Sequence, residues 1–118
     1  MNNKWSKLTN LERNLLVGLE VMNFNNGHSS IIEWKKSFQY HHDLGIWNYS
    51  TNPRQAYDIL EKLIDEGYVV EIKIISSNQF LCKFAHTTDL LSETLYSEGE
   101  SFQESVCLAA LRSKGIML

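Results

Sequence analysis

The feature that most constrains this fold is the stretch over residues 52–84, where the spacing of apolar side chains changes from helical to extended. Asn52 and Pro53 are typical of a helix start, because asparagine caps the first turn and proline fits the first helical position. Apolar side chains then follow at helical spacing for about three turns, until Gly67 stands where a left-handed C-cap belongs. We therefore predict a helix over residues 52–66.

An antiparallel strand pair is predicted directly after this helix. Residues 68–75 are rich in β-branched side chains and alternate as a strand does. Ser76-Ser77-Asn78 has the composition of a turn, and residues 79–84 alternate again. A third, more exposed strand is predicted over residues 92–97.

Two further helices are predicted on either side of this unit. Thr9 and Glu12 have the spacing of a capping box and begin a helix over residues 10–22. Ser101 and Glu104 repeat that pattern and begin a helix over residues 102–114, which is apolar on more than half of its surface and is therefore expected to be central. Helices packed against a small antiparallel sheet define an α+β fold.

In the remaining stretch, residues 23–50, the apolar side chains follow neither helical nor strand spacing. We interpret this stretch as an ordered aromatic loop that packs on the body of the protein, and for residues 31–34 a short helix or a short strand stays open. The chain has no internal repeat and no low-complexity segment, and its 118 residues suit one core, so we expect a single domain over residues 1–118.

Composition argues against several classes of partner. Eleven Lys and Arg against fourteen Asp and Glu give a net charge of −3, which does not favour binding of long nucleic acid. No apolar run reaches the roughly 18 residues of a membrane span, and the N-terminus has no signal-peptide core. Two cysteines do not make a disulfide framework, so we expect a reducing cytosol.

Three segments resemble the phage ABA-sandwich domain family: Tyr49-Ser50-Thr51, the helix from Ala56 to Gly67, and Ser105-Val106-Cys107-Leu108-Ala109-Ala110-Leu111-Arg112. The resemblance runs from Leu11 to Gly115. The family often has aspartate where Asn52 stands, and a start at Pro53 is less familiar in it. The resemblance implies an α/β/α sandwich with a small, mainly antiparallel sheet flanked by helices, in a bacteriophage or prophage protein. It brings no established catalytic residues, so none is transferred.

The residues themselves show no catalytic or metal-binding motif, so we expect no enzyme, no cofactor and no metal site. His41 and His42 are adjacent, and adjacent side chains diverge, whereas zinc ligands usually have spacings that converge. We therefore interpret them as solvated loop histidines. Cys82 and Cys107 fall on predicted inner faces, where a free cysteine acts as a small hydrophobe.

The most informative candidate site is the aromatic loop, where rings are interleaved with cations. Rings stack on bases or anchor protein partners, and cations hold phosphates. Arg54 would add its charge in the first turn of a helix, where backbone amides also favour anions. The candidate ligand-binding residues are Trp34, Lys35, Lys36, Tyr40, His41, Trp47 and Arg54. The alternative is that these rings only cover the sheet and the helix ends.

Two functions remain open for a phage protein of this size. In the first, it sequesters a small nucleotide-derived immune signal of its host in a pocket completed by a second subunit, so that the protein is a homo-oligomer. In the second, it is an adaptor or inhibitor that binds a host or phage protein, and the same aromatic side chains anchor the interface. Both functions place the protein in the bacterial cytosol, without a membrane partner.

Overall fold

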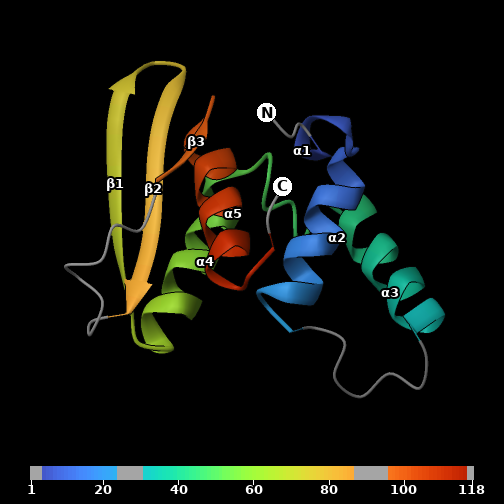
Figure 1. Ribbon diagram of the computed structural model, residues 1–118. Helices are drawn as coiled ribbons and strands as arrows, with labels where there is room; N and C mark the ends of the chain where they lie inside the picture. Colours follow the sequence, from blue (N-terminus) through green and yellow to red (C-terminus); the bar gives the residue numbers. More distant parts are fainter. Residues whose placement is uncertain (1–3, 24–30, 87–95, 117–118) are drawn as a thin grey trace.

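The computed structural model describes residues 4–23, 31–86 and 96–116, with the backbone alone for residues 31–34 and 86. In chain order its elements are α1 (Lys4–Lys7), α2 (Asn10–Glu20), α3 (Ile31–Asp43), α4 (Pro53–Asp65), β1 (Tyr68–Ser76), β2 (Gln79–His86), β3 (Ser97–Gly99) and α5 (Phe102–Ser113). The strands form one antiparallel sheet of order β1-β2-β3 (Figure 1). This arrangement confirms the α+β fold expected from the sequence.

The layers follow the order sheet, α4 with α5, and α2 with α3 (Figure 1). α5 contacts β2, β3, α4 and α2, and six of its 12 residues are buried, so the prediction of a central helix is confirmed. α4 packs on β1 and α5, whereas α2 reaches the body through α5. The second helical layer therefore lies on the far side of α5 and not on the outer face of the sheet.

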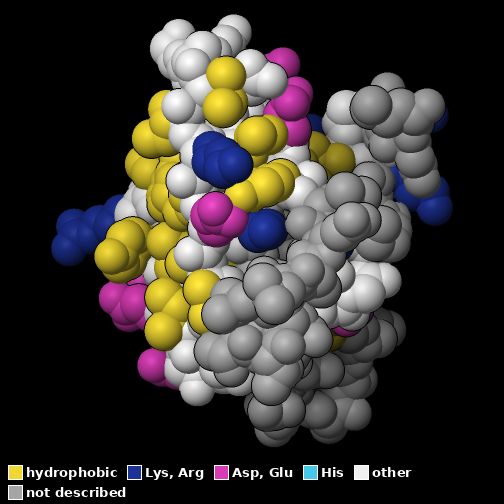
Figure 2. Space-filling model, turned by 60° about the vertical axis from the view of Figure 1, so that its left-hand side comes forward, with side chains coloured by type: hydrophobic (Ala, Val, Ile, Leu, Met, Phe, Trp, Pro, Cys, Tyr) yellow, Lys and Arg dark blue, Asp and Glu magenta, His cyan; other side chains and the backbone are white. Residues whose placement is uncertain are grey.

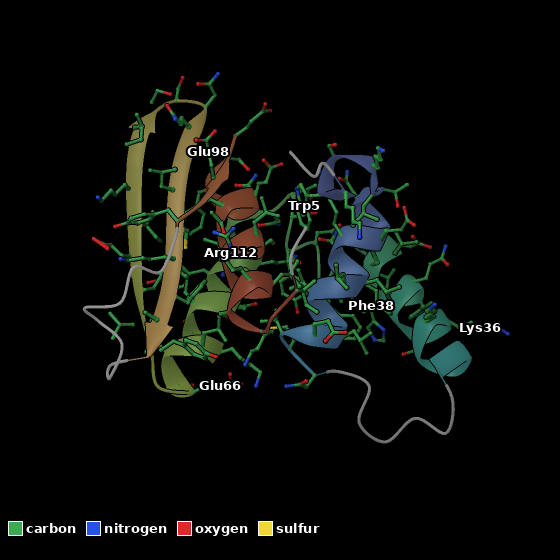
Figure 3. All side chains as sticks on the ribbon, in the orientation of Figure 1. Trp5, Lys36, Phe38, Glu66, Glu98 and Arg112 are labelled. Carbon is green, nitrogen blue, oxygen red and sulfur yellow. The ribbon has the colours of Figure 1, made fainter. Side chains whose placement is uncertain are left out.

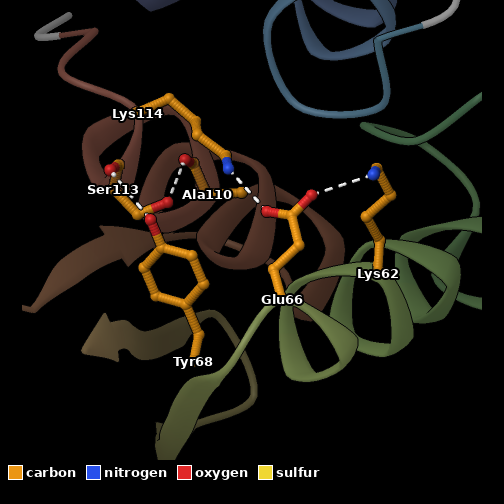
Figure 4. Close-up of polar contacts among 6 residues, drawn as sticks. All are labelled: Lys62, Glu66, Tyr68, Ala110, Ser113 and Lys114. Atoms are coloured by element: carbon orange, nitrogen blue, oxygen red, sulfur yellow. Dashed lines mark hydrogen bonds and ion pairs between the residues drawn. The ribbon is translucent and has the colours of Figure 1, made fainter. Parts of the chain in front are cut away.

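α4 begins and ends as the sequence predicts. The Asn52 side chain accepts hydrogen bonds from the backbone amides of Arg54 and Gln55, and Gly67 follows the helix with φ of 98°. The last turn of α4 is also tied to the end of α5. Glu66 lies between Lys62, 2.8 Å away, and Lys114, 2.6 Å away (Figure 4).

The predicted strand pair is confirmed, and each strand is slightly longer than expected. Ile72 of β1 lies opposite Cys82 of β2, and the register shifts between Ile74 and Ser76. The third strand differs from the prediction of an exposed strand over residues 92–97. It spans Ser97–Gly99 with both end residues buried, and residues 92–95 lie outside the described part of the chain.

Close backbone packing explains why this third strand is buried. A Cβ atom on Gly99 would lie 2.5 Å from the backbone nitrogen of Ser105, in the first turns of α5. The helix start itself is only half of the predicted capping box. The Ser101 hydroxyl accepts from the Glu104 amide, but the Glu104 carboxylate accepts from the amide of Glu100.

The N-terminal helix is confirmed, including both hydrogen bonds of the capping box at Thr9. The buried face of this helix is not made of its leucines. Asn14, Val17, Gly18 and then Val21 are buried, whereas the leucines of α2 are half-buried. α2 is thus covered on more than one side, because α3 and α5 both contact it.

The prediction of an aromatic loop over residues 23–50 is wrong for its centre, because residues 31–43 form α3. Ile31, Trp34, Phe38 and His41 do follow helical spacing, but histidine does not count as apolar, so the period is obscured. A close approach holds α3 against α2. A Cβ atom on Gly18 would lie 2.6 Å from Cε2 of Phe38, so only glycine leaves room for this ring.

Candidate functional site

The candidate site is built on an aromatic cluster at the end of α3. Phe38 is fully buried between α2 and α3 (Figure 3). Trp47, in the segment after α3, stacks on the ring of Phe38 with centroids 5.1 Å apart and on His41 at 4.5 Å. His41 also makes a hydrogen bond of 2.8 Å from Nδ1 to the carbonyl oxygen of Ser37. These rings hold the segment after α3 against the helix.

A buried amide ties three parts of the chain together beneath this cluster. Asn14 of α2 is fully buried, and its Oδ1 accepts a 2.7 Å hydrogen bond from the backbone amide of Ser50. Its Nδ2 lies 2.9 Å from Nε2 of His42. Because an amide nitrogen can only donate, the His42 Nε2 is the acceptor and its hydrogen is on Nδ1.

The segment between α3 and α4 is held from the other side by Gln55. Its Nε2 donates to the carbonyl oxygen of Gly45 at 2.8 Å, and its Oε1 accepts from the backbone amide of Asn48. Trp47 lies between these two anchors with φ of 64°, a conformation that costs an ordinary residue about 1 kcal/mol or more. The surrounding contacts therefore fix the position of its ring.

A hollow of about 500 Å³ opens beside this ring, between α4 and the chain around residue 47. Aromatic and apolar side chains form one wall, and α4 supplies a polar wall with three carboxylates and one lysine. The lining residues are Met22, Ile46, Trp47, Tyr49, Gln55, Asp58, Glu61, Lys62 and Asp65. An aromatic wall facing carboxylates suits a cation better than a phosphate.

Tyr49 forms the inner end of this wall. It is 2% exposed, and burial raises the pKa of its hydroxyl well above the usual range, with the negative charge of Asp58 adding to the effect. The phenol therefore stays neutral under all ordinary conditions. It contributes an apolar surface and a hydrogen-bonding group, and no charge.

The structure brings together only some of the candidate residues. Tyr40 and His41 meet edge to face at 5.5 Å, and His41 stacks on Trp47. Lys35 and Lys36 lie exposed on α3, where Lys36 points away from the body (Figure 3). Arg54 is exposed in the first turn of α4. These three cations are separate from the lining of the hollow, and the side chain of Trp34 lies outside the described part of the structure.

The histidines and cysteines also have structural partners. His41 and His42 belong to a helix and are half-buried, so the interpretation as solvated loop histidines is wrong. Cys82 and Cys107 are fully buried, as predicted, and desolvation raises the pKa of Cys82 to about 12 and that of Cys107 further. Among the described residues, no group of three or more histidine, cysteine or acidic side chains is placed to hold a metal ion.

Sequence reasoning missed two residues that shape the site. Asn14 lies three and seven residues before Val17 and Val21, so helical spacing places it on their face of the helix, and a polar residue on an apolar face is a usable signal of a buried hydrogen bond. Gln55 lies in the first turn of a predicted helix, and nothing in the sequence indicates that its side chain holds the chain beside Trp47. The carboxylates of the hollow have the spacing of an outward, solvated helix face, so their sequence does not indicate that they line a site.

Fold and site together define a small α+β domain whose candidate site is an aromatic cluster beside an acidic hollow. None of the helices in the described ranges has the length and apolar character that a membrane crossing needs. The family model of the phage ABA sandwich domain matches residues 15–111, so the chain belongs to this family. Comparison with curated proteins found no match, and comparison with solved structures found none.

Proposed function

We propose that this phage protein acts without catalysis, as an adaptor or inhibitor that binds another protein. The observation that carries the proposal is the exposed surface at the end of α3. Tyr40 is 65% exposed, Leu44 62% and Ile46 42%, within seven consecutive residues. Tyrosine and aliphatic side chains presented together are typical of the anchors of protein interfaces. The exposed Lys35 and Lys36 beside them suit an acidic rim on the partner.

The test is capture of a partner from lysate of a host bacterium, with the full chain as bait. Tyr40→Ala together with Leu44→Ala is expected to abolish stoichiometric capture, because both anchors are lost while the melting temperature stays nearly unchanged. Asn10→Ala is the control, since Asn10 is exposed on a different helix and lies outside both the α3 surface and the sheet edge. Equal capture by all three proteins, or no stoichiometric partner at all, would overturn the proposal.

A second candidate is sequestration of a small nucleotide-derived immune signal. The observation that favours it is that Tyr40 and Lys36 lie four residues apart on α3, about one helical turn, and are both exposed. Tyr40, Trp34 or Trp47 would stack on the base, and Lys35, Lys36 or Arg54 would neutralise phosphate. A second subunit would be needed to enclose the ligand, because this surface is convex along a helix.

Two features weigh against this second candidate. The hollow beside Trp47 has three carboxylates in its lining, which repel phosphate. The amides of Arg54 and Gln55 already donate to Asn52, so they are less available to an anion. Isothermal titration with a panel of cyclic nucleotides, and mass spectrometry of molecules retained by the native protein, test it directly. Absence of heat and of a retained nucleotide would eliminate it.

A further inference from the structure

β1 forms one edge of the sheet in the described part of the structure. β1 is nine residues long and, among the described strands, pairs only with β2. Three apolar side chains of this strand are exposed: Val69 at 38%, Ile74 at 70% and Ile75 at 55%. Figure 2 shows hydrophobic side chains gathered over this side of the molecule, with charged ones between them. A long edge strand with apolar side chains readily pairs with another strand.

The sequence of β1 is complementary to itself when it is reversed about Ile72. In an antiparallel pair of two copies with this residue on the two-fold axis, Glu71 lies opposite Lys73 of the second copy, and Lys73 lies opposite Glu71. Val70 then faces Ile74, and Ile72 faces its own copy. Both charges and all flanking apolar side chains thus find suitable neighbours in one register.

We propose that the protein forms a homodimer in which β1 of one copy pairs antiparallel with β1 of a second copy. The three strands of each copy then join into one continuous sheet, and the two-fold axis passes through Ile72. Such a contact is isologous and closes after two copies. It therefore pairs the open backbone N–H and C=O groups of both edge strands without growth of a fibre. The inference stands independently of the proposed function, because it concerns a different surface.

Charges already held in the monomer fix the register. Glu71 accepts a hydrogen bond from the Tyr96 hydroxyl and lies 3.4 Å from Nζ of Lys83 on β2. Nζ of Lys73 lies 4.8 Å from the centre of the Tyr96 ring. Shifting the two-fold axis by one residue in either direction would place Glu71 opposite Glu71, or Lys73 opposite Lys73. Like charges directly opposite each other are unfavourable, so the axis at Ile72 is preferred.

The helix below β1 supports the same contact. α4 is the helix that packs on β1, so pairing of the two edges brings α4 of each copy closer together. Tyr57 and Ile64 are 55% and 50% exposed, and their spacing of seven residues places them on one flank of α4. Asp58 and Lys62 line the hollow on the opposite flank. The exposed apolar flank is therefore available to a second copy.

Sedimentation velocity of the full chain over a range of concentrations tests this dimer. The wild type is expected to pass from monomer to dimer, and Lys73→Glu is expected to weaken the dimer about tenfold or more, because two attractive pairs become repulsive. Glu71→Lys should do the same. The double variant carrying both changes should recover most of the affinity, because the complementary pairs are restored with opposite sign.

Two further variants separate pairing from folding. Ile74→Lys adds a charge at the most exposed apolar position of the edge and should keep the protein monomeric with a folded circular dichroism spectrum. Leu44→Lys is the matched control, since Leu44 is 62% exposed on the other side of the molecule, and it should leave the dimer intact. A wild type that stays monomeric at every soluble concentration, or a dimer unaffected by Ile74→Lys, would overturn the proposal. Loss of rescue in the double variant would refute the register.

Discussion

The buried amide of Asn14 should carry a large part of the stability of the N-terminal half. It is fully buried and joins α2 to α3 through His42 and to the start of α4 through the amide of Ser50. Asn14→Ala removes both hydrogen bonds, so the buried amide of Ser50 and the half-buried ring of His42 both lose a partner.

The magnitude follows from these two groups. Each buried polar group left unsatisfied costs about 1–3 kcal/mol, whereas alanine recovers roughly 0.5 kcal/mol of helix propensity. We therefore expect the free energy of unfolding to fall by about 1.5–5.5 kcal/mol, toward the lower part of this range because the His42 ring is only half-buried. A domain of this size typically has about 5–15 kcal/mol in total, so the variant should still fold.

Urea unfolding followed by circular dichroism measures this loss. With a slope of about 2 kcal/mol per molar urea, in the middle of the usual range, the midpoint should fall by roughly 1–3 M. Asn10→Ala is the matched control, because Asn10 is exposed on the same helix and its loss should change stability by at most about 0.5 kcal/mol. Hydrogen exchange at the Ser50 amide should also accelerate in Asn14→Ala. Equal stability of the two alanine variants would refute this account of the buried amide.

Three further predictions follow from the packing and the charges. Gly99→Ala should destabilise the protein by about 2 kcal/mol or more in the same unfolding assay, because the new Cβ would meet the backbone of α5 at 2.5 Å. Cys82 and Cys107 should resist a thiol reagent until the protein unfolds, because burial raises the pKa of both thiols. Glu66→Gln should lower stability at neutral pH. Hydrogen bonds from Lys114 and Lys62 lower the pKa of Glu66 in the folded protein. The stability that the ionised Glu66 adds is therefore present above the unfolded pKa and is lost as the pH falls through the folded pKa. The melting temperatures of the wild type and Glu66→Gln should therefore converge in acid.

The accuracy of the sequence prediction depended on local signals. The unit from α4 to β2 was predicted within one or two residues at each boundary, because Asn52, Pro53 and Gly67 mark the helix ends and the first six residues of β1 alternate between half-buried and exposed. The missed helix, α3, lacks such signals. The side of α3 that faces α2 includes the apolar Phe38 but also His42, which contacts the polar Asn14 of α2. The sequence of α3 alone therefore does not show which of its residues face the protein.

The candidate site was less predictable than the fold because it depends on tertiary contacts. The rings of Tyr40, His41 and Trp47 do gather, since they are close in sequence. The cations do not join them, because Lys36 lies on the outward face of α3 and Arg54 begins a different helix. The acidic wall of the hollow comes from one exposed face of α4, and only the fold shows that this face lies opposite Trp47 and Tyr49.

The two proposed surfaces have a joint consequence that neither has alone. α3 and β1 lie at opposite ends of the molecule (Figure 1), so a dimer formed through β1 would direct its two α3 surfaces outward. Such a dimer is bivalent, and a bivalent protein gains apparent affinity only where partner molecules are dense enough to be bound together. Lys73→Glu should therefore dissociate faster than the wild type from a densely immobilised partner and bind equally well to the same partner at low density. If Lys73→Glu and the wild type dissociate equally fast at both densities, the dimer does not present its two α3 surfaces together.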